Sequence, residues 1–372
     1  MLPVPNASPA GRAAGPLPLG SPCARLTPRT GWHGRAFVLP RETLGGGGAE
    51  PVRYGGALPD SGGPAQRGDP TLWQALTGRH CPGQTRLLFA VSAALAAPCA
   101  ALADAAAPAW WHLIGPSAGG RTILLRVAAS VYGPPAYVQR WRATDNGLES
   151  LAAAHSDLPL ILDELAQLDA KVAGEAAYML ANGSGKVRAS RADDPCIRLT
   201  WRLWAMSAGE VGLCPDTARS AAAEPWRCLA ELPADAGRGF GIFDGPGEFD
   251  SAAALAAHLN GAALLAHGTL GRAWLSWLVE AEDRRLSAEL RERMAGFAGL
   301  ALPAAAADDI RSTAERFALV AAAGEMATAA GLTGWRVGQA QAAALTLFRT
   351  WLDSRRATAG TTTNNTTTGG AR

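Results

Sequence analysis

The middle of the chain alternates between short apolar runs and stretches whose apolar residues recur at helical spacing. The apolar runs lie at 110–114, 137–141, 158–162, 197–207 and 227–232, and the helical stretches between them at 123–127, 147–154 and 172–181. Strands that alternate with helices are typical of a parallel sheet with helices on both faces. The pattern therefore predicts an α/β core over 109–249.

Different patterns flank this core. Residues 31–108 predict a small α+β module, with strands at 32–39 and 51–54 and helices at 71–76 and from Arg86. Residues 250–357 predict an all-α module. Its helices are expected at 253–264, 273–280, 286–297, 308–330, with a break near Gly324, and 337–355.

The ends of the chain lack any such periodicity. Residues 1–30 are rich in Pro and Gly, and residues 358–372 are mostly Thr, Asn and Gly, so both are expected to be disordered. The apolar stretch 87–103 contains Ser92 and Pro98, which favour a buried helix over a membrane span.

Composition narrows the functional classes. The 372 residues are 48% hydrophobic and carry a net charge of +2, so contact with nucleic acid would need a local basic patch, and no membrane partner is expected. The six cysteines form no CxxC pair and the first thirty residues contain no signal-peptide core. These features predict a cytoplasmic protein.

A glycine-rich loop follows the first strand of the core. Residues 115–122 match the phosphate-binding template G-x-x-x-x-G-K-[ST] at Gly115, Gly120 and Thr122, with Arg121 in place of lysine. Backbone N–H groups of such a loop and the following helix N-terminus bind phosphate, and the hydroxyl ligates Mg²⁺. The predicted cofactors are ATP and Mg²⁺, and the predicted nucleotide-binding residues are Gly115, Ser117, Gly119, Gly120, Arg121 and Thr122.

A second motif lies about forty residues further on. The run 158–162 ends in Asp163 and Glu164, which is the Walker B pattern. Asp163 is expected to hold Mg²⁺ together with Thr122, and Glu164 to activate the attacking water. Arginine carries its charge on a planar fork, so Arg121 supports phosphate binding better than it supports hydrolysis.

Further candidates surround these motifs. Ser207 ends a predicted strand and is a candidate γ-phosphate sensor, whereas Asp145 is interpreted as part of a helix cap. The candidate arginine fingers are Arg227, Arg238 and Arg316. Lys186, Arg188 and Arg191 lie on a glycine-rich loop, which either contacts a nucleic-acid backbone or is a solvated connector.

The chain resembles a bacterial P-loop family of unknown function that is described as helicase-like or as an inactivated helicase derivative. The resemblance runs from about Gly31 to Leu352 and is carried by residues 31–40, 141–146, 162–164, 178–183, 233–237 and 315–325. It implies an ATP-binding core of the AAA-like or RecA-like kind, in primase-helicase-like proteins of prophages and integrating elements. Arg121 departs from the family's lysine.

Two functions follow from these observations. The first is a helicase-like ATPase that works on DNA of a mobile element, with single-stranded DNA as a partner and a homo-oligomeric ring as its assembly. The second is a nucleotide-binding scaffold or regulator without useful turnover, which Arg121 would explain.

Overall fold

The structure is a computed structural model that describes residues 24–46, 50–56, 62–103, 108–116, 120–141, 144–165, 170–186, 198–213, 228–281, 283–303 and 305–366. Most of the expected disordered leader, 1–23, and the last residues of the expected tail, 367–372, lie outside the described residues.

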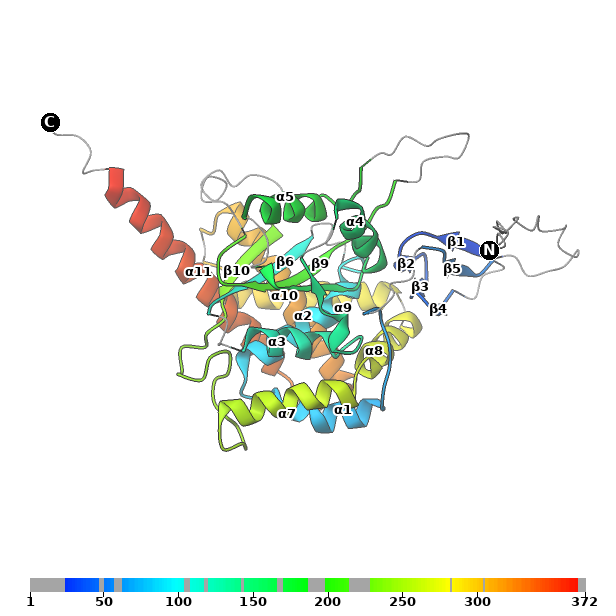
Figure 1. Ribbon diagram of the computed structural model, residues 1–372, viewed down its shortest axis with the longest axis horizontal. Coiled ribbons are helices and arrows are strands. Elements are labelled where there is room, and N and C mark those ends of the chain that lie inside the picture. The colour runs from blue at the N-terminus through cyan, green and yellow to red at the C-terminus, as the bar shows by residue number, and fades with distance from the viewer. Residues whose placement is uncertain are drawn as a thin grey trace, which may run out of the picture.

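A parallel sheet of five strands forms the centre of the molecule (Figure 1). Its order is β10-β6-β9-β8-β7, and every neighbouring pair is parallel. The strands are β6 (Ala109–Ile114), β7 (Gln139–Arg140), β8 (Pro159–Asp163), β9 (Trp204–Gly209) and β10 (Leu229–Pro233). The predicted α/β class and parallel sheet are therefore confirmed.

Strand β7 is shorter than the predicted strand over 137–141. The preceding residues form a 3-10 turn, η4 (Pro135–Tyr137), and the buried Tyr137 hydroxyl donates to the Pro159 carbonyl at 2.9 Å. Proline fixes its own φ near −65°, which suits such a turn better than an extended strand.

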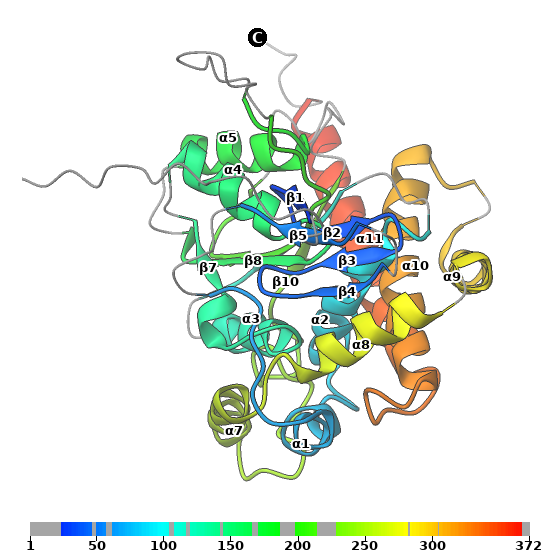
Figure 2. The ribbon, with the colours of Figure 1, turned by 90° about the vertical axis from the view of Figure 1, so that its right-hand side faces the viewer.

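Helices cover both faces of the sheet because consecutive strand residues point to opposite sides. Trp110 and Leu160 belong to a buried cluster with α4 (Asp145–Ala154) and α5 (Ala170–Ala181). Their neighbours Trp111 and Ile161 belong to a second cluster with α2 (Thr85–Ala96) and α3 (Arg121–Ala129). Figure 2 shows α4 and α5 above the sheet and α3 and α2 below it.

Helices from before and after the central sheet in the sequence pack against one another. α10 (Asp308–Ala329) packs against α2, α9 (Asp283–Ala301) and α11 (Gln339–Thr366), and α11 also packs against α2. Shorter elements complete this part of the fold: α1 (Pro70–Leu76), η1 (Gly78–His80), η2 (Ala97–Cys99), α7 (Ala252–Leu265) and α8 (Thr269–Glu280). α2 of the predicted N-terminal module thus packs directly against α10 and α11 of the predicted C-terminal module.

The expected break near Gly324 is absent, since α10 runs unbroken through this residue. A Cβ atom at Gly324 would lie 2.4 Å from Ser92 Oγ and 2.6 Å from Ala340 Cβ. The glycine therefore allows three helices to approach closely and does not end one of them. α11 also continues to Thr366, into the stretch expected to be disordered from residue 358. Within the described ranges, no helix is both long and apolar enough to span a membrane.

Short strands form the N-terminal part. β1 (Arg25–Thr27) pairs in parallel with β5 (Val52–Tyr54), and β2 (Gly31–His33), β3 (Ala36–Val38) and β4 (Thr43–Gly45) form an antiparallel sheet. The single strand predicted over 32–39 is a hairpin, because Gly34 turns the chain with a φ of +63°. β1 and β4 were not predicted, and β1 lies within residues 1–30, so the expectation of disorder is wrong for this part of the leader.

A buried carboxylate fastens this part to the central sheet. Asp157 is fully buried and accepts a hydrogen bond from the Trp32 backbone N–H at 2.9 Å. It also accepts two hydrogen bonds from the Arg202 guanidinium, from Nε and from Nη2, each at 2.6 Å. Arg29 lies 3.8 Å from the same carboxylate. Asp157 and Arg202 precede β8 and β9, so the contact is made at the amino end of the sheet and leaves the carboxyl end clear.

Candidate functional site

The glycine-rich segment 115–122 follows β6, where the strand order of the sheet reverses. From β6 the chain passes to β7 at the far edge, while β10 pairs on the other side of β6. In open α/β sheets ligands bind at the carboxyl ends of strands at such a point. Gly115 N–H donates to the Gly209 carbonyl at 3.1 Å, and Gly120, with a φ of +85°, precedes the first turn of α3. Ser117 and Gly119 lie outside the described residues.

A hydrogen bond joins the two motifs predicted from the sequence. Thr122, in the first turn of α3, donates from Oγ1 to Asp163 Oδ2 at 2.8 Å, although the residues are 41 positions apart. Asp163 is the last residue of β8. A hydroxyl and a carboxylate at this distance are hard oxygen ligands of the type that Mg²⁺ prefers.

Glu164 has an unusual backbone. Its φ is +63°, in the left-handed region that non-glycine residues rarely adopt, and its N–H donates to Asp163 Oδ1 at 2.8 Å. Strain of this kind is concentrated at functional sites. Arg140 Nε lies 3.3 Å from Glu164 Oε2, because β7 pairs with β8 in a register that sets Arg140 opposite Asp163. No motif in the sequence points to Arg140.

Arg121 occupies the lysine position of the phosphate-binding template and is buried, with 9% of its surface exposed. Its Nη2 atom lies 3.9 Å from Oε1 of Glu210, the residue directly after β9. Its Nη1 atom is buried and has no hydrogen-bond partner among the described residues. A buried donor without a partner is costly, typically about 1–3 kcal/mol, so this nitrogen fits an anionic ligand.

Ser207 does not reach the end of its strand, contrary to expectation. It is fully buried two residues before the end of β9, where its hydroxyl contacts Trp110 Nε1 and His112 Nδ1, each at 2.8 Å. A side chain so enclosed cannot contact a γ-phosphate, so the sensor assignment is wrong. The polar residue that does follow the strand is Glu210, which was not among the predicted site residues.

The candidate arginine fingers differ in their surroundings. Arg316 is buried in α10 and donates from Nε to the Pro108 carbonyl at 3.0 Å. It therefore cannot reach a neighbouring molecule, so its prediction as an arginine finger is wrong and it is a core residue. Arg238 is exposed on the loop after β10. Arg227 lies outside the described residues.

The basic glycine-rich segment is described only at its base. Lys186 is exposed, and its ammonium lies 2.8 Å from Asp145 Oδ2, which raises the pKa of the lysine through this hydrogen bond. Arg188 and Arg191 lie outside the described residues. The capping interpretation at the start of α4 is confirmed: Thr144 accepts from the Gly147 N–H, and Asp145 is the first helical residue.

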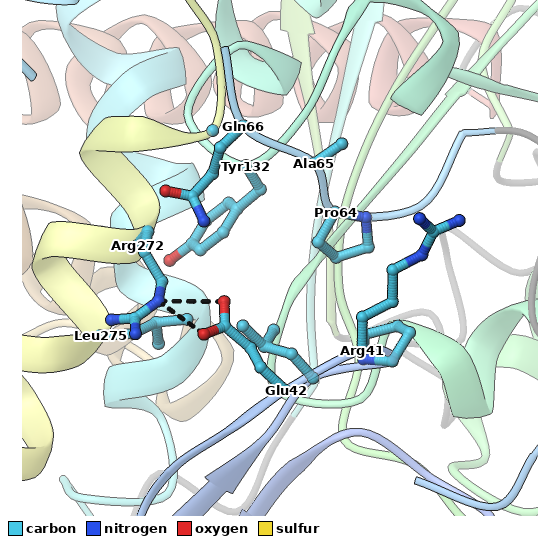
Figure 3. A pocket seen from close by; sticks show the side chains of 11 residues that line it. Arg41, Glu42, Pro64, Ala65, Gln66, Tyr132, Arg272 and Leu275 are labelled. Carbon is cyan, nitrogen blue, oxygen red and sulfur yellow. Dashed lines mark hydrogen bonds and ion pairs between the residues drawn. The ribbon is translucent and has the colours of Figure 1, made fainter. Parts of the chain in front are cut away.

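A small cavity lies between the β3–β4 turn, residues 64–66 and α8 (Figure 3). Its wall includes Tyr132 and an ion pair in which Arg272 Nε lies 2.9 Å from Glu42 Oε1. The cavity measures about 40 Å³, enough for a few water molecules and not for a nucleotide.

Comparison with known proteins adds a family match and a fold. The family described as "Domain of unknown function (DUF927)" matches residues 20–195. A solved structure titled "SCCmec type IV Cch - active helicase" superposes with a TM-score of 0.64 at 16% sequence identity, over 87% of this chain and 57% of that one. No curated protein matches the chain.

The chain therefore has a helicase-like α/β fold. At 16% identity the likeness shows the fold alone, and the chain spans 57% of the length of that helicase chain. The resemblance to a helicase-like family expected from the sequence agrees with both matches.

Proposed function

We propose that this chain binds ATP with Mg²⁺ at the carboxyl ends of β6 and β8 and acts as a helicase-like ATPase. The observation that carries the proposal is the 2.8 Å hydrogen bond between Thr122 and Asp163. It brings a hydroxyl at the N-terminus of α3 and a carboxylate at the end of β8 to one point, which is the arrangement that the Walker A and Walker B motifs require.

Each residue would have a separate task. The first turn of α3 and the Arg121 guanidinium would bind the phosphates, for which the unpartnered Nη1 atom is suited. Thr122 and Asp163 would hold Mg²⁺, and Glu164 would orient and deprotonate the attacking water. The metal would supply neutralisation of charge on the phosphates.

We propose DNA as the polymer on which the ATPase acts, in the metabolism of a mobile element. The support is the fold shared with a protein titled an active helicase of SCCmec and the basic segment 183–191. Near the start of this segment the backbones of Ser184 and Thr200 form an isolated antiparallel β-bridge, and Arg198 donates to the Ser184 hydroxyl at 2.7 Å. Lys186, Arg188 and Arg191 would then contact a phosphate backbone. Arg238 and Arg227 remain proposed fingers of a ring.

A second candidate is a nucleotide-binding scaffold with little turnover. The observation in its favour is that Glu164, the proposed base, lies 3.3 Å from Arg140, while arginine stands where the template has lysine. The Arg140 guanidinium would then occupy the carboxylate that has to hold the attacking water.

Phosphate release from ATP separates the two candidates. We would compare the wild type with Glu164→Gln and Arg121→Lys, and with Glu280→Gln as an exposed matched control at the end of α8, each with and without single-stranded DNA. The ATPase proposal expects Glu164→Gln to lower turnover about 100-fold or more while ATP still binds, and DNA to stimulate the wild type.

Other outcomes would change the conclusion. Binding without turnover in the wild type, with turnover restored by Arg121→Lys, would favour the scaffold. Equal turnover in the wild type and Glu164→Gln would remove Glu164 from the chemistry. Failure of single-stranded DNA to bind at low salt would refute the DNA part of the proposal.

A further inference from the structure

The contact between Arg121 and Glu210 joins the first turn of α3 to the residue that follows β9. Glu210 is the more open partner, with 54% of its side chain exposed, against 11% for Arg121. One end of the guanidinium thus faces a carboxylate at 3.9 Å, while Nη1 is buried without a partner in the described structure.

Buried side chains fix the backbone on which Glu210 stands. His112 Nε2 lies 2.9 Å from the Val211 carbonyl, which can only accept, so Nε2 carries the proton and donates. His112 Nδ1 then accepts from the Ser207 hydroxyl at 2.8 Å, and that hydroxyl accepts from Trp110 Nε1. This chain of hydrogen bonds ties the turn after β9 to strand β6.

Gly209 makes this arrangement possible. A Cβ atom there would lie 2.7 Å from the Leu165 side chain and 3.1 Å from the His112 ring. The backbone on either side of Glu210 is therefore fixed, by the packing of Gly209 against Leu165 and His112 and by the hydrogen bond from His112 to the Val211 carbonyl. These buried contacts set the position of Glu210 beside Arg121.

The charges at this end of the sheet leave little attraction for phosphate. Carboxylates stand at Asp163, Glu164 and Glu210, while the guanidinium of Arg140 is paired with Glu164 and that of Arg121 faces Glu210. Among the described residues the three carboxylates outnumber the two guanidinium groups, so the polyphosphate of ATP would meet a net negative charge from them unless a divalent cation accompanied it.

We propose that Glu210 is a counter-ion for Arg121 that the phosphates of the nucleotide must displace, and that it makes nucleotide binding depend on Mg²⁺. This inference rests on the proposed ATP-binding function and adds a residue that regulates the same site. In the free protein Glu210 neutralises Arg121, and in the bound protein the phosphates take its place.

The test is the dissociation constant of a non-hydrolysable ATP analogue, measured with Mg²⁺ and with EDTA, so that turnover does not enter. We would compare the wild type with Glu210→Gln, an isosteric change at a half-exposed position, and confirm by thermal denaturation that both are equally folded. The matched control is Glu289→Gln, which removes the carboxylate of another partly exposed ion pair, with Arg293 on α9 at 2.8 Å.

We expect Glu210→Gln to bind the analogue about fivefold more tightly than the wild type in EDTA, the factor that one charge about 4 Å away is worth in water. Its ratio of affinities with and without Mg²⁺ should fall by the same factor, and Glu289→Gln should match the wild type.

Two results would overturn the proposal, and they can be told apart. If the wild type binds and Glu210→Gln has the same or weaker affinity in EDTA, Glu210 is not a competing counter-ion, while the ATP-binding proposal stands. If neither protein binds the analogue under any condition, the proposed function itself fails.

Discussion

Replacement of Asp157 by asparagine tests whether one buried carboxylate holds the N-terminal strands to the central sheet. Asparagine keeps the shape, tolerates the φ of +59°, and can still accept from the Trp32 N–H, so the change removes mainly the charge. Removing one partner of a buried ion pair costs about 3–5 kcal/mol. Arg202 and Arg29 are 38% and 22% exposed and regain some solvation, so we expect about 2–3 kcal/mol.

Differential scanning calorimetry would measure this loss as a fall in Tm of about 4–12 °C, at roughly 2–4 °C per kcal/mol for domains somewhat smaller than this one. The control is Asp353→Asn, which breaks the pair with Arg356 at 3.7 Å, where the side chains are 74% and 66% exposed. That variant should lose less than about 0.5 kcal/mol. Equal Tm values for the two variants would refute the assigned role of Asp157.

Two further predictions concern the core. Burial lowers the pKa of His155 to about 4 and leaves its Nε2 without a partner in the described structure, so the folded protein resists protonation there while the unfolded chain titrates near 6.5. The free energy of unfolding should therefore fall by about 3 kcal/mol from this residue as the pH drops from about 6.5 to 4. In His155→Gln, urea midpoints should no longer show this dependence on pH. Gly324→Ala should cost about 1–3 kcal/mol of stability in thermal melts, because its Cβ would overlap Ser92 and Ala340. Gly261→Ala on α7, where nothing lies within 4 Å, should instead stabilise by up to about 1 kcal/mol; equal effects at the two glycines would contradict the packing argument.

The parts of the fold that the sequence predicted best are those whose signal is local. β6, α3 and β8 follow from short apolar runs, a glycine loop and a helical pattern, and each was found close to its expected bounds. The meeting of Thr122 and Asp163 also follows, because the parallel strands β6 and β8 end at the same edge of one sheet, with only β9 between them.

The errors arose where distant residues decide the outcome. The end of β9 is set by its pairing with β6, in which Gly209 lies opposite Ile114, so Ser207 is buried and Glu210 reaches the edge. Nothing in the run 197–207 reveals that register. Arg316 looked like a free cation, but α10 packs it against the segment before β6, a contact between residues more than 200 positions apart.

Gly324 illustrates a related ambiguity. A glycine inside a helical pattern predicts either a break or a close approach of another helix, and only the positions of Ser92 and Ala340 select the second. Arg140 was missed because its significance depends on the register of β7 against β8.

The measurement that tests the central claim most directly is equilibrium binding of Mg²⁺ and a non-hydrolysable ATP analogue to the wild type, Thr122→Val and Asp163→Asn. If the two side chains hold the metal, each variant should bind at least about tenfold more weakly than the wild type while keeping its fold. Wild-type binding that neither substitution weakens would contradict a nucleotide site at the carboxyl ends of β6 and β8.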